Sequence, residues 1–146
     1  MVSFLSQKFS KRVFVYTHSS ITELTIEGKK IFFKRDDLLH TEINGNKARK
    51  FYSLLTNPPS IKTLKSAGGN QSNAMLALAR IANYNRWSFH YLTPTIPLWL
   101  KNAPQGNLLE SLNCHMILHE TPKHQWNEMV TQFSQISSDT LYLPQG

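Results

Sequence analysis

The sequence predicts an α/β protein built on an open parallel sheet with helices on both faces. From residue 61 onward, strand-like and helix-like segments alternate, an order that is typical of parallel strands in one sheet. The segment from Ala74 to Ala82 is apolar almost all round, as in a helix that is buried on most sides. With 146 residues, 40% of them hydrophobic, the chain is long enough to form one domain with a core.

Before residue 46 the sequence favours strands. Residues 13–16, Val-Phe-Val-Tyr, form a short strand-like run. Residues 23–34 predict a hairpin in which Leu24–Ile26 pairs with Ile31–Phe33 across a turn that contains Gly28. Charges of alternating sign follow at residues 34–37 and can pair locally at the end of the strand.

After residue 45 the pattern changes to helices and strands in turn. A helix from Asn46 would place Ala48, Phe51, Tyr52 and Leu55 on one buried stripe. The elements that we expect after it are, in order, a strand at 61–65, a helix at 71–83, a strand at 87–92, an irregular proline-bounded segment at 94–104, a helix at 106–112, a strand at 115–119, a helix with a stripe at Trp126, Met129, Val130, Phe133 and Ile136, and a strand at 140–143.

The charge balance suits an acidic partner but does not single out nucleic acid. The 16 Lys and Arg against 9 Asp and Glu give a formal net charge of +7. These charges are spread along the chain, with no long basic run and no zinc-finger spacing, so the charge pattern does not favour nucleic-acid binding.

The remaining compositional signals favour a soluble protein of a reducing compartment. The single cysteine, Cys114, excludes an intramolecular disulfide and is typical of a small buried residue. The N-terminus lacks the apolar core of a signal peptide, and no apolar run is long enough to span a bilayer. We therefore expect no membrane partner and a cytoplasmic location.

The stretch from Asn44 to Lys50 holds the first candidate for chemistry. It places Lys47, Arg49 and Lys50 in the opening turn of the expected helix, where cations meet the positive end of the helix dipole. The dipole and the mutual repulsion of these cations favour a neutral amine, the form that condenses with an aldehyde. A solvated basic helix face is the other interpretation of the same pattern.

The stretch from Gly68 to Asn73 holds the second candidate. It follows a strand and begins a buried helix, which is where ligands bind in open α/β sheets and where backbone N–H groups are available to an anion. Two glycines allow the backbone to approach a ligand closely. Helix capping by Asn70, Ser72 and Asn73 explains the same residues equally well.

Taken together, these motifs resemble a known family. Four of them occur in one order: Lys34-Arg35-Asp36-Asp37-Leu38, Gly45-Asn46-Lys47-Ala48-Arg49-Lys50, Gly69-Asn70-Gln71-Ser72-Asn73 and Gly106-Asn107-Leu108-Leu109. They resemble the 1-aminocyclopropane-1-carboxylate deaminase and D-cysteine desulfhydrase family, whose members are pyridoxal 5'-phosphate enzymes of fold type II. The resemblance runs from about residue 30 to the C-terminus.

The resemblance implies a role for each matching residue of the cofactor site. Lys47 would carry the cofactor, and Lys50 would reach toward its phosphate. Asn46 would position the ring, and Asn73 would hydrogen-bond the phenolic oxygen.

The substrate side of the site follows from the same resemblance. Gln71, Ser72 and Asn73 would bind the substrate, with Ser72 assisting proton transfer or attack. The implied reaction releases ammonia, or sulfide from D-cysteine, together with a 2-oxo acid. It would be classed among the lyases or hydrolases.

Two departures from the family pattern affect these expectations. Asn44 replaces a usual glycine and Ala74 replaces a frequent histidine, while family members are roughly twice as long. The resemblance thus implies that residues 1–45 are strands of an incomplete large domain and that residues 46–146 are the small α/β domain with the cofactor lysine. A second polypeptide would complete the fold, and a homodimer is a further possibility.

Two other interpretations of the chain remain open at this point. The first is a non-catalytic remnant of a disrupted gene, suggested by the abrupt end at Gly146. The second is a basic nucleic-acid-binding module, whose affinity would fall steeply with salt. His115 and His119 share one face of an expected strand, but no further ligand on that face favours a metal site.

Overall fold

A computed structural model describes residues 18–43 and 45–145, so the strand-like run at 13–16 and Asn44 lie outside the described residues. The described elements are β1 (Ile21–Ile26), β2 (Lys29–Lys34), a 3-10 turn (Asp36–Leu38), α1 (Asn46–Lys50), α2 (Tyr52–Thr56), β3 (Thr63–Ala67), α3 (Asn73–Asn85), β4 (Ser88–Pro94), α4 (Leu98–Asn102), α5 (Gly106–Asn113), β5 (Ile117–Thr121), a 3-10 turn (Lys123–Gln125), α6 (Trp126–Phe133) and β6 (Thr140–Tyr142).

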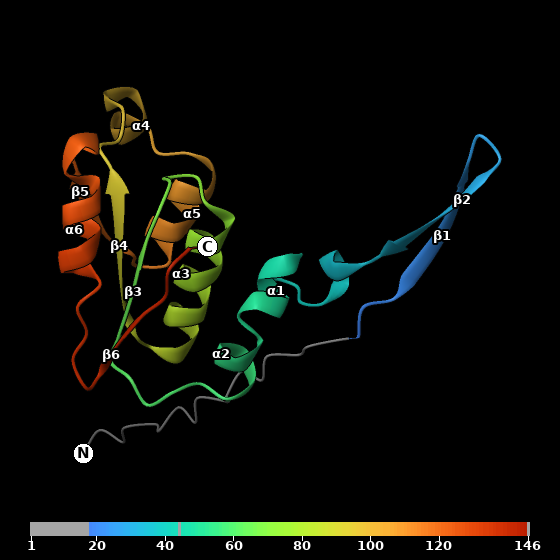
Figure 1. Cartoon of the computed structure of the whole chain (residues 1–146), viewed down its shortest axis with the longest axis horizontal. Coiled ribbons are helices and arrows are strands. Elements are labelled where there is room, and N and C mark those ends of the chain that lie inside the picture. The colour runs from blue at the N-terminus through green and yellow to red at the C-terminus, as the bar shows by residue number, and fades with distance from the viewer. Residues whose placement is uncertain (1–17, 44, 146) are drawn as a thin grey trace, which may run out of the picture.

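The predicted parallel sheet is confirmed. Its four strands lie in the order β5-β4-β3-β6, and every neighbouring pair is parallel. Helix α3 contacts β3 and β4 and packs on α5, while α6 contacts β4 from the opposite side of the sheet (Figure 1). The helices therefore cover both faces, because each parallel crossover must carry the chain back over the sheet.

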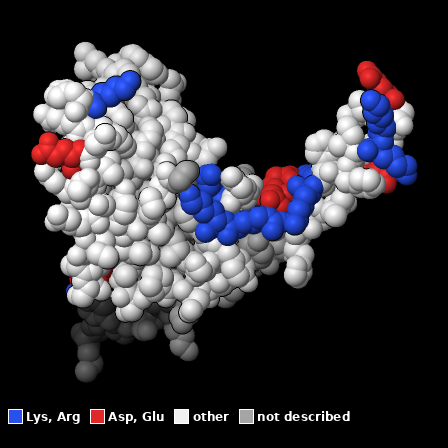
Figure 2. All heavy atoms as spheres, viewed as in Figure 1, with Lys and Arg blue, Asp and Glu red and all other residues white. Residues whose placement is uncertain are grey.

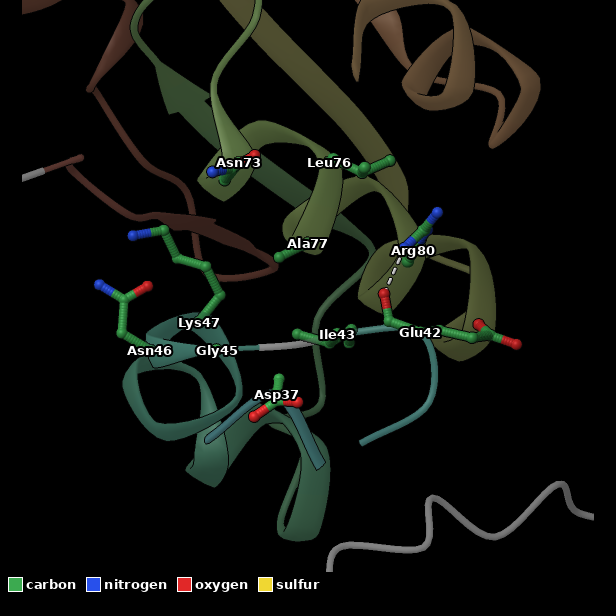
Figure 3. A pocket seen from close by; sticks show the side chains of 10 residues that line it. All are labelled: Asp37, Glu42, Ile43, Gly45, Asn46, Lys47, Asn73, Leu76, Ala77 and Arg80. Atoms are coloured by element: carbon green, nitrogen blue, oxygen red, sulfur yellow. Dashed lines mark hydrogen bonds between the residues drawn. The ribbon is translucent and has the colours of Figure 1, made fainter. Parts of the chain in front are cut away.

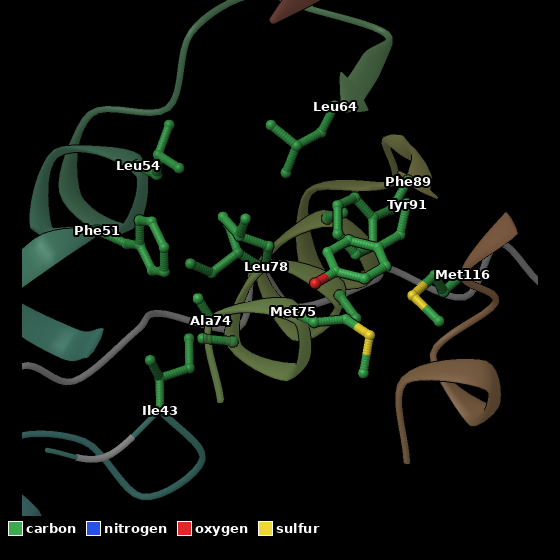
Figure 4. Close-up of a cluster of buried hydrophobic side chains, with 14 of the residues drawn as sticks. Ile43, Phe51, Leu54, Leu64, Ala74, Met75, Leu78, Phe89, Tyr91 and Met116 are labelled. Atoms are coloured by element: carbon green, nitrogen blue, oxygen red, sulfur yellow. The ribbon is translucent and has the colours of Figure 1, made fainter. Parts of the chain in front are cut away.

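The core lies between the sheet and α3. Met75 and Leu78 of α3 are fully buried and meet Leu64, Phe89 and Tyr91 from β3 and β4 (Figure 4). This explains the apolar run that the sequence shows on nearly every side of α3. The helix is covered by strands on one side and by α1 and α5 on others.

The predicted hairpin forms and extends away from the sheet. Strands β1 and β2 pair antiparallel, with Leu24 opposite Ile31, and the turn places Glu27 and Gly28 at positive φ. Figure 1 shows the hairpin projecting far from the α/β unit, which we define as residues 61–145. Every residue of β2 is exposed.

The helix expected from Asn46 is divided into two short helices. At Phe51 the backbone leaves the helical region, with φ −106° and ψ 19°. The Phe51 ring remains buried in the core. Tyr52 is 48% exposed, so the prediction that Tyr52 lies on the buried stripe was wrong. Burial of the Phe51 ring outweighs helix continuity at this position.

Three further expectations are corrected in the second half of the chain. The proline-bounded segment contains α4, which begins after Pro97. Helix α6 ends at Phe133, so Ile136 lies beyond it and is exposed instead of joining the stripe. His115 adopts a positive φ in the turn before β5, and it therefore does not share a strand face with His119.

On the face seen in Figure 2, basic side chains line the arm between the α/β unit and the hairpin. Figure 2 shows Lys and Arg along the arm that joins the α/β unit to the hairpin, around α1 and the segment that precedes it. Acidic side chains lie among them, since Arg49 pairs with Asp36 and Arg35 with Asp37.

Candidate functional site

A pocket of about 300 Å³ opens between α1, α3 and the segment that follows the hairpin (Figure 3). Its lining side chains come from three separate stretches of sequence: Asp37, Glu42, Ile43, Gly45, Asn46, Lys47, Asn73, Leu76, Ala77 and Arg80. The fold thus brings together three of the predicted site residues, namely Asn46, Lys47 and Asn73.

Lys47 is half-buried in the first turn of α1. The turn before it needs Gly45, which adopts φ +63° and donates its N–H to the Asp36 carbonyl at 3.0 Å. Because α1 has only five residues, its dipole is small, and the helix-dipole argument made from the sequence loses force. Burial and position in the pocket are what distinguish Lys47 from an ordinary surface lysine.

An ion pair fixes α1 against the preceding segment. Arg49 donates from Nε and Nη2 to the two carboxylate oxygens of Asp36, each at 2.7 Å, and from Nη2 to Ser19 Oγ at 3.0 Å. The hydrogen bond from Arg49 holds the pKa of Asp36 below its ordinary value. Arg49, the second cation of the stretch, is therefore engaged in structure, whereas Lys47 lines the pocket.

Lys50 does not line this pocket. It is exposed, and its Nζ lies 5.8 Å from the centroid of the Phe51 ring. Its implied contact with a cofactor phosphate stays a prediction.

Ser72 serves as the N-cap of α3. Its Oγ accepts from the N–H groups of Ala74 and Met75 at 3.1 and 3.3 Å, and donates to Gln145 Oε1 at 2.7 Å. The interpretation of this loop as helix capping is thus correct for Ser72. Ser72 does not line the pocket around Lys47.

Close packing holds the strand end before Ser72. The Tyr91 hydroxyl donates to the Gly69 carbonyl at 3.0 Å, and burial raises the pKa of Tyr91. A Cβ on Gly68 would lie 2.5 Å from Gln145 Oε1 and 2.8 Å from the Tyr91 hydroxyl oxygen. A side chain on Gly68 would therefore displace Gln145 or Tyr91. Gln145 Nε2 is buried and has no hydrogen-bond partner among the described residues.

Gln71 faces α5 and a second pocket, not the pocket around Lys47. Its Nε2 donates to the Gln105 carbonyl at 3.1 Å, and its Oε1 accepts from the Asn107 N–H at 3.0 Å. The second pocket, of about 470 Å³, is lined by Asn70, Gln71, Pro97, Trp99, Leu100, Gln105 and Gly106.

Sequence reasoning missed the charged wall of the first pocket. Arg80 of α3 donates to the Glu42 carbonyl and pairs with Glu110 of α5, and Asp37 and Glu42 also line the pocket. The available signal was Arg80 itself, the one charged residue in the otherwise apolar run of α3.

The described part of the chain offers neither a membrane span nor a metal cluster. No helix there is long and apolar enough to cross a membrane. No group of three or more His, Cys, Asp and Glu residues is placed there to hold a metal ion.

The α/β architecture is shared with several solved enzyme structures. The crystal structure of a 1-aminocyclopropane-1-carboxylate deaminase homologue superposes with a TM-score of 0.64 over 94% of this chain, at 18% identity. A hydrogen sulfide-producing enzyme from Fusobacterium nucleatum gives 0.59 over 88% at 10% identity, and cysteine synthase from Entamoeba histolytica gives 0.51 over 97% at 10% identity. At these identities the likeness establishes the fold.

A curated relative confirms the resemblance that the motifs predicted. The bifunctional D-cysteine desulfhydrase/1-aminocyclopropane-1-carboxylate deaminase of Arabidopsis thaliana, a mitochondrial protein, is 36% identical over 101 residues, or 64% of this chain. No family model matches the sequence. The chain spans a quarter of the length of this relative and just under half of the solved structures.

Proposed function

We propose that this chain binds pyridoxal 5'-phosphate through Lys47 and forms one part of a deaminase or desulfhydrase site for a small amino acid. The observation that carries the proposal is that Lys47 and Asn73, 26 residues apart in sequence, line one pocket together with Asn46. These are the residues to which the resemblance assigns the cofactor.

The donor set of the pocket fits this cofactor. Lys47 offers a half-buried amine for the aldehyde, and the amide of Asn73 offers an N–H donor for the phenolic oxygen. Asn46 lies beside Lys47 in the lining of the pocket. The pocket volume, about 300 Å³, is at the lower end of the range for small-molecule sites.

Within the proposed reaction the residues of this chain bind, orient and move protons. When bound, the cofactor supplies the electron sink for cleavage of bonds at the substrate α-carbon. Lys47 would hold the cofactor through its amine, and the same amine would move a proton at the substrate α-carbon once it is free of the cofactor. The Ser72 hydroxyl proton is held by Gln145, so Ser72 must leave this hydrogen bond before it can donate to substrate.

The proposed substrates are 1-aminocyclopropane-1-carboxylate and D-cysteine, which the curated relative's name gives for that protein. The products would be a 2-oxo acid with ammonia, and sulfide in the case of D-cysteine.

We also propose that a further polypeptide segment completes the site by packing on the hairpin. The supporting observations are the exposed apolar residues of β1 and β2 and the coverage of less than half of the solved structures. A second copy of this chain is the competing occupant.

The test of cofactor binding is chemical capture. The chain is incubated with pyridoxal 5'-phosphate and reduced with borohydride, and the labelled residue is located by peptide mass spectrometry. We expect the label on Lys47, its loss in Lys47→Ala, and no change in Lys29→Ala, which removes an exposed hairpin lysine. Label spread over several exposed lysines, unchanged in Lys47→Ala, would refute the proposal.

The partner is tested separately. The purified chain is mixed with the C-terminal half of a homologous desulfhydrase, and 2-oxo acid release from D-cysteine is compared with that of either polypeptide alone. We expect release only in the mixture. A stable dimer of the chain by itself, with no change on mixing, would favour the homodimer.

A further inference from the structure

The Gly106-Asn107 motif has no role in the site described so far, although Asn107 makes hydrogen bonds with the second predicted ligand stretch, at Gln71 and Asn73. Asn107 is half-buried in the first turn of α5 and does not line the pocket around Lys47. Its Nδ2 donates to the Gln71 carbonyl at 2.9 Å and to Asn73 Oδ1 at 2.8 Å. Asn107 thus contacts a residue that lines the pocket, Asn73, without lining the pocket itself.

The two contacts fix which way the Asn107 amide lies. A backbone carbonyl only accepts hydrogen bonds, so the Asn107 atom next to the Gln71 carbonyl must be the NH₂ group. The second hydrogen of that NH₂ group is directed at Asn73, whose nearest atom must therefore be an acceptor. The orientation of the Asn73 amide therefore follows from the Gln71 backbone carbonyl, whose atoms are unambiguous. It does not depend on telling the side-chain oxygen of Asn73 from its nitrogen.

Once Asn73 Oδ1 is held in this way, its Nδ2 is the group left to face the pocket. In Figure 3 the nitrogen of Asn73 lies on the side of the Lys47 amine, and the oxygen lies on the far side. The pocket therefore receives an N–H donor from Asn73, which suits an anionic or phenolic ligand oxygen.

The neighbouring contacts hold Asn107 at the required place. Gly106 adopts φ +60°, and a Cβ there would lie 2.7 Å from Gln71 Oε1, so glycine is needed both for the turn and for the approach. Gln71 in turn accepts from the Asn107 N–H and donates to the Gln105 carbonyl. The loop before α3 and the start of α5 are thereby joined by four hydrogen bonds around Gln71, Asn73 and Asn107.

We propose that Asn107 is a positioning residue that orients the Asn73 amide, so that Asn73 presents a donor and not an acceptor to the ligand oxygen in the pocket. The ligand identity rests on the proposed function. The orientation itself is a property of the chain without ligand.

The ligand test uses pyridoxamine 5'-phosphate, which keeps the phenolic oxygen but has no aldehyde and so does not need Lys47. Asn107→Asp keeps the shape of the side chain but removes the NH₂ group, so Asn73 should turn its Nδ2 toward the new carboxylate and its oxygen toward the ligand. We expect affinity by titration calorimetry to fall about tenfold or more. The affinity of Asn73→Asp should fall by a similar factor, because this variant keeps the hydrogen bond from Asn107 while offering only oxygen atoms to the ligand.

Asn113→Asp is the matched control. It makes the same change of charge at an exposed position at the other end of α5 and should leave affinity within twofold. If Asn107→Asp binds as tightly as the parent chain and its fold is intact, the proposal is wrong. If both α5 variants weaken binding equally, charge alone explains the effect and the proposal is also wrong.

The second test needs no ligand. In ¹⁵N spectra of the parent chain, the side-chain NH₂ of Asn107 should exchange slowly with water and that of Asn73, which is exposed, should exchange rapidly. In Asn107→Asp the Asn73 NH₂ should become protected. A protected Asn73 NH₂ in the parent chain, or no change in the variant, would overturn the proposal even where the chain binds no pyridoxal compound at all.

Discussion

The hairpin and the α/β unit use the same kinds of side chain with opposite results. Through the strand register, Leu24, Ile31 and Phe33 share one face of the hairpin, yet each is more than a third exposed. In the α/β unit, Leu64 and Phe89 are buried against α3. The difference lies in the partner element, because a two-stranded ribbon has no second layer to cover its apolar face.

This comparison teaches where stability and binding reside. The α/β unit has a core and should determine the cooperative unfolding of the chain. The hairpin contributes little to that core, and its apolar face is the part of the surface that most needs a covering partner.

The largest effect should come from matched deletions in the two regions. Leu78→Ala removes a fully buried side chain from α3 and should lower the free energy of unfolding by about 2–5 kcal/mol. Phe32→Ala removes a hairpin side chain that is 64% exposed and should change it by less than about 0.5 kcal/mol. Urea unfolding measures both. Equal losses would show that the hairpin is part of the cooperative unit.

The next effect tests how tightly the α/β unit is packed at its strand ends. Gly68→Ala places a methyl group within 3 Å of Gln145 and Tyr91 and should lower the free energy of unfolding by about 1–3 kcal/mol. Gly69→Ala meets no atom within 4 Å and is the control, with an expected change within about 0.5 kcal/mol. Thermal and urea denaturation of the pair separate packing from the loss of a glycine.

A smaller effect should appear as a pH dependence on the α6 side of the sheet. His90 Nδ1 and His119 Nε2 lie 2.9 Å apart in stacked rings, and burial lowers the pKa of both. Because the folded pKa values lie below the unfolded value, the unfolded state binds more protons, and stability should fall as the pH drops below about 6.5. In His119→Gln the free energy of unfolding should decrease less between pH 7.5 and 5.5 than it does in the parent chain. An unchanged slope would exclude the pair as its source.

The smallest effect compares one ion pair from each region. Lys30 and Glu23 meet at 2.8 Å on the hairpin with both side chains exposed, so Lys30→Ala should change the free energy of unfolding by less than about 0.5 kcal/mol. Lys101 pairs at 2.9 Å with Glu120, whose side chain is only 26% exposed and also accepts the Ile96 N–H. Lys101→Ala should therefore cost more than Lys30→Ala, and the reverse order would contradict the contrast between the regions.

The fold was predictable where local pattern and tertiary structure agree. The apolar run of α3 has no place outside a core, and Gly28 between two apolar runs indicates a hairpin. The division at Phe51 was not predictable, because a continuous helix and two short ones share the same periodicity over so few residues. Helix α4 was hidden by the prolines around it, of which Pro97 starts the helix.

The candidate site was predictable in part for a similar reason. Lys47 and Asn73 come from local stretches with their own chemical signature. The engagement of Gln71 by Asn107, 36 residues later, depends on the crossing of α5 over the start of α3, which no local spacing encodes. The Ser72 contact with Gln145 spans 73 residues and was hidden in the same way.

The segment between β2 and α1 belongs to both regions. It continues directly from the hairpin, its Asp36 is held by Arg49, and its Asp37, Glu42 and Ile43 line the pocket. Thermodynamic linkage then sets a reciprocal condition on the molecule. Whatever factor a partner on the hairpin imposes on the affinity of the pocket, a ligand in the pocket must impose on the affinity for that partner.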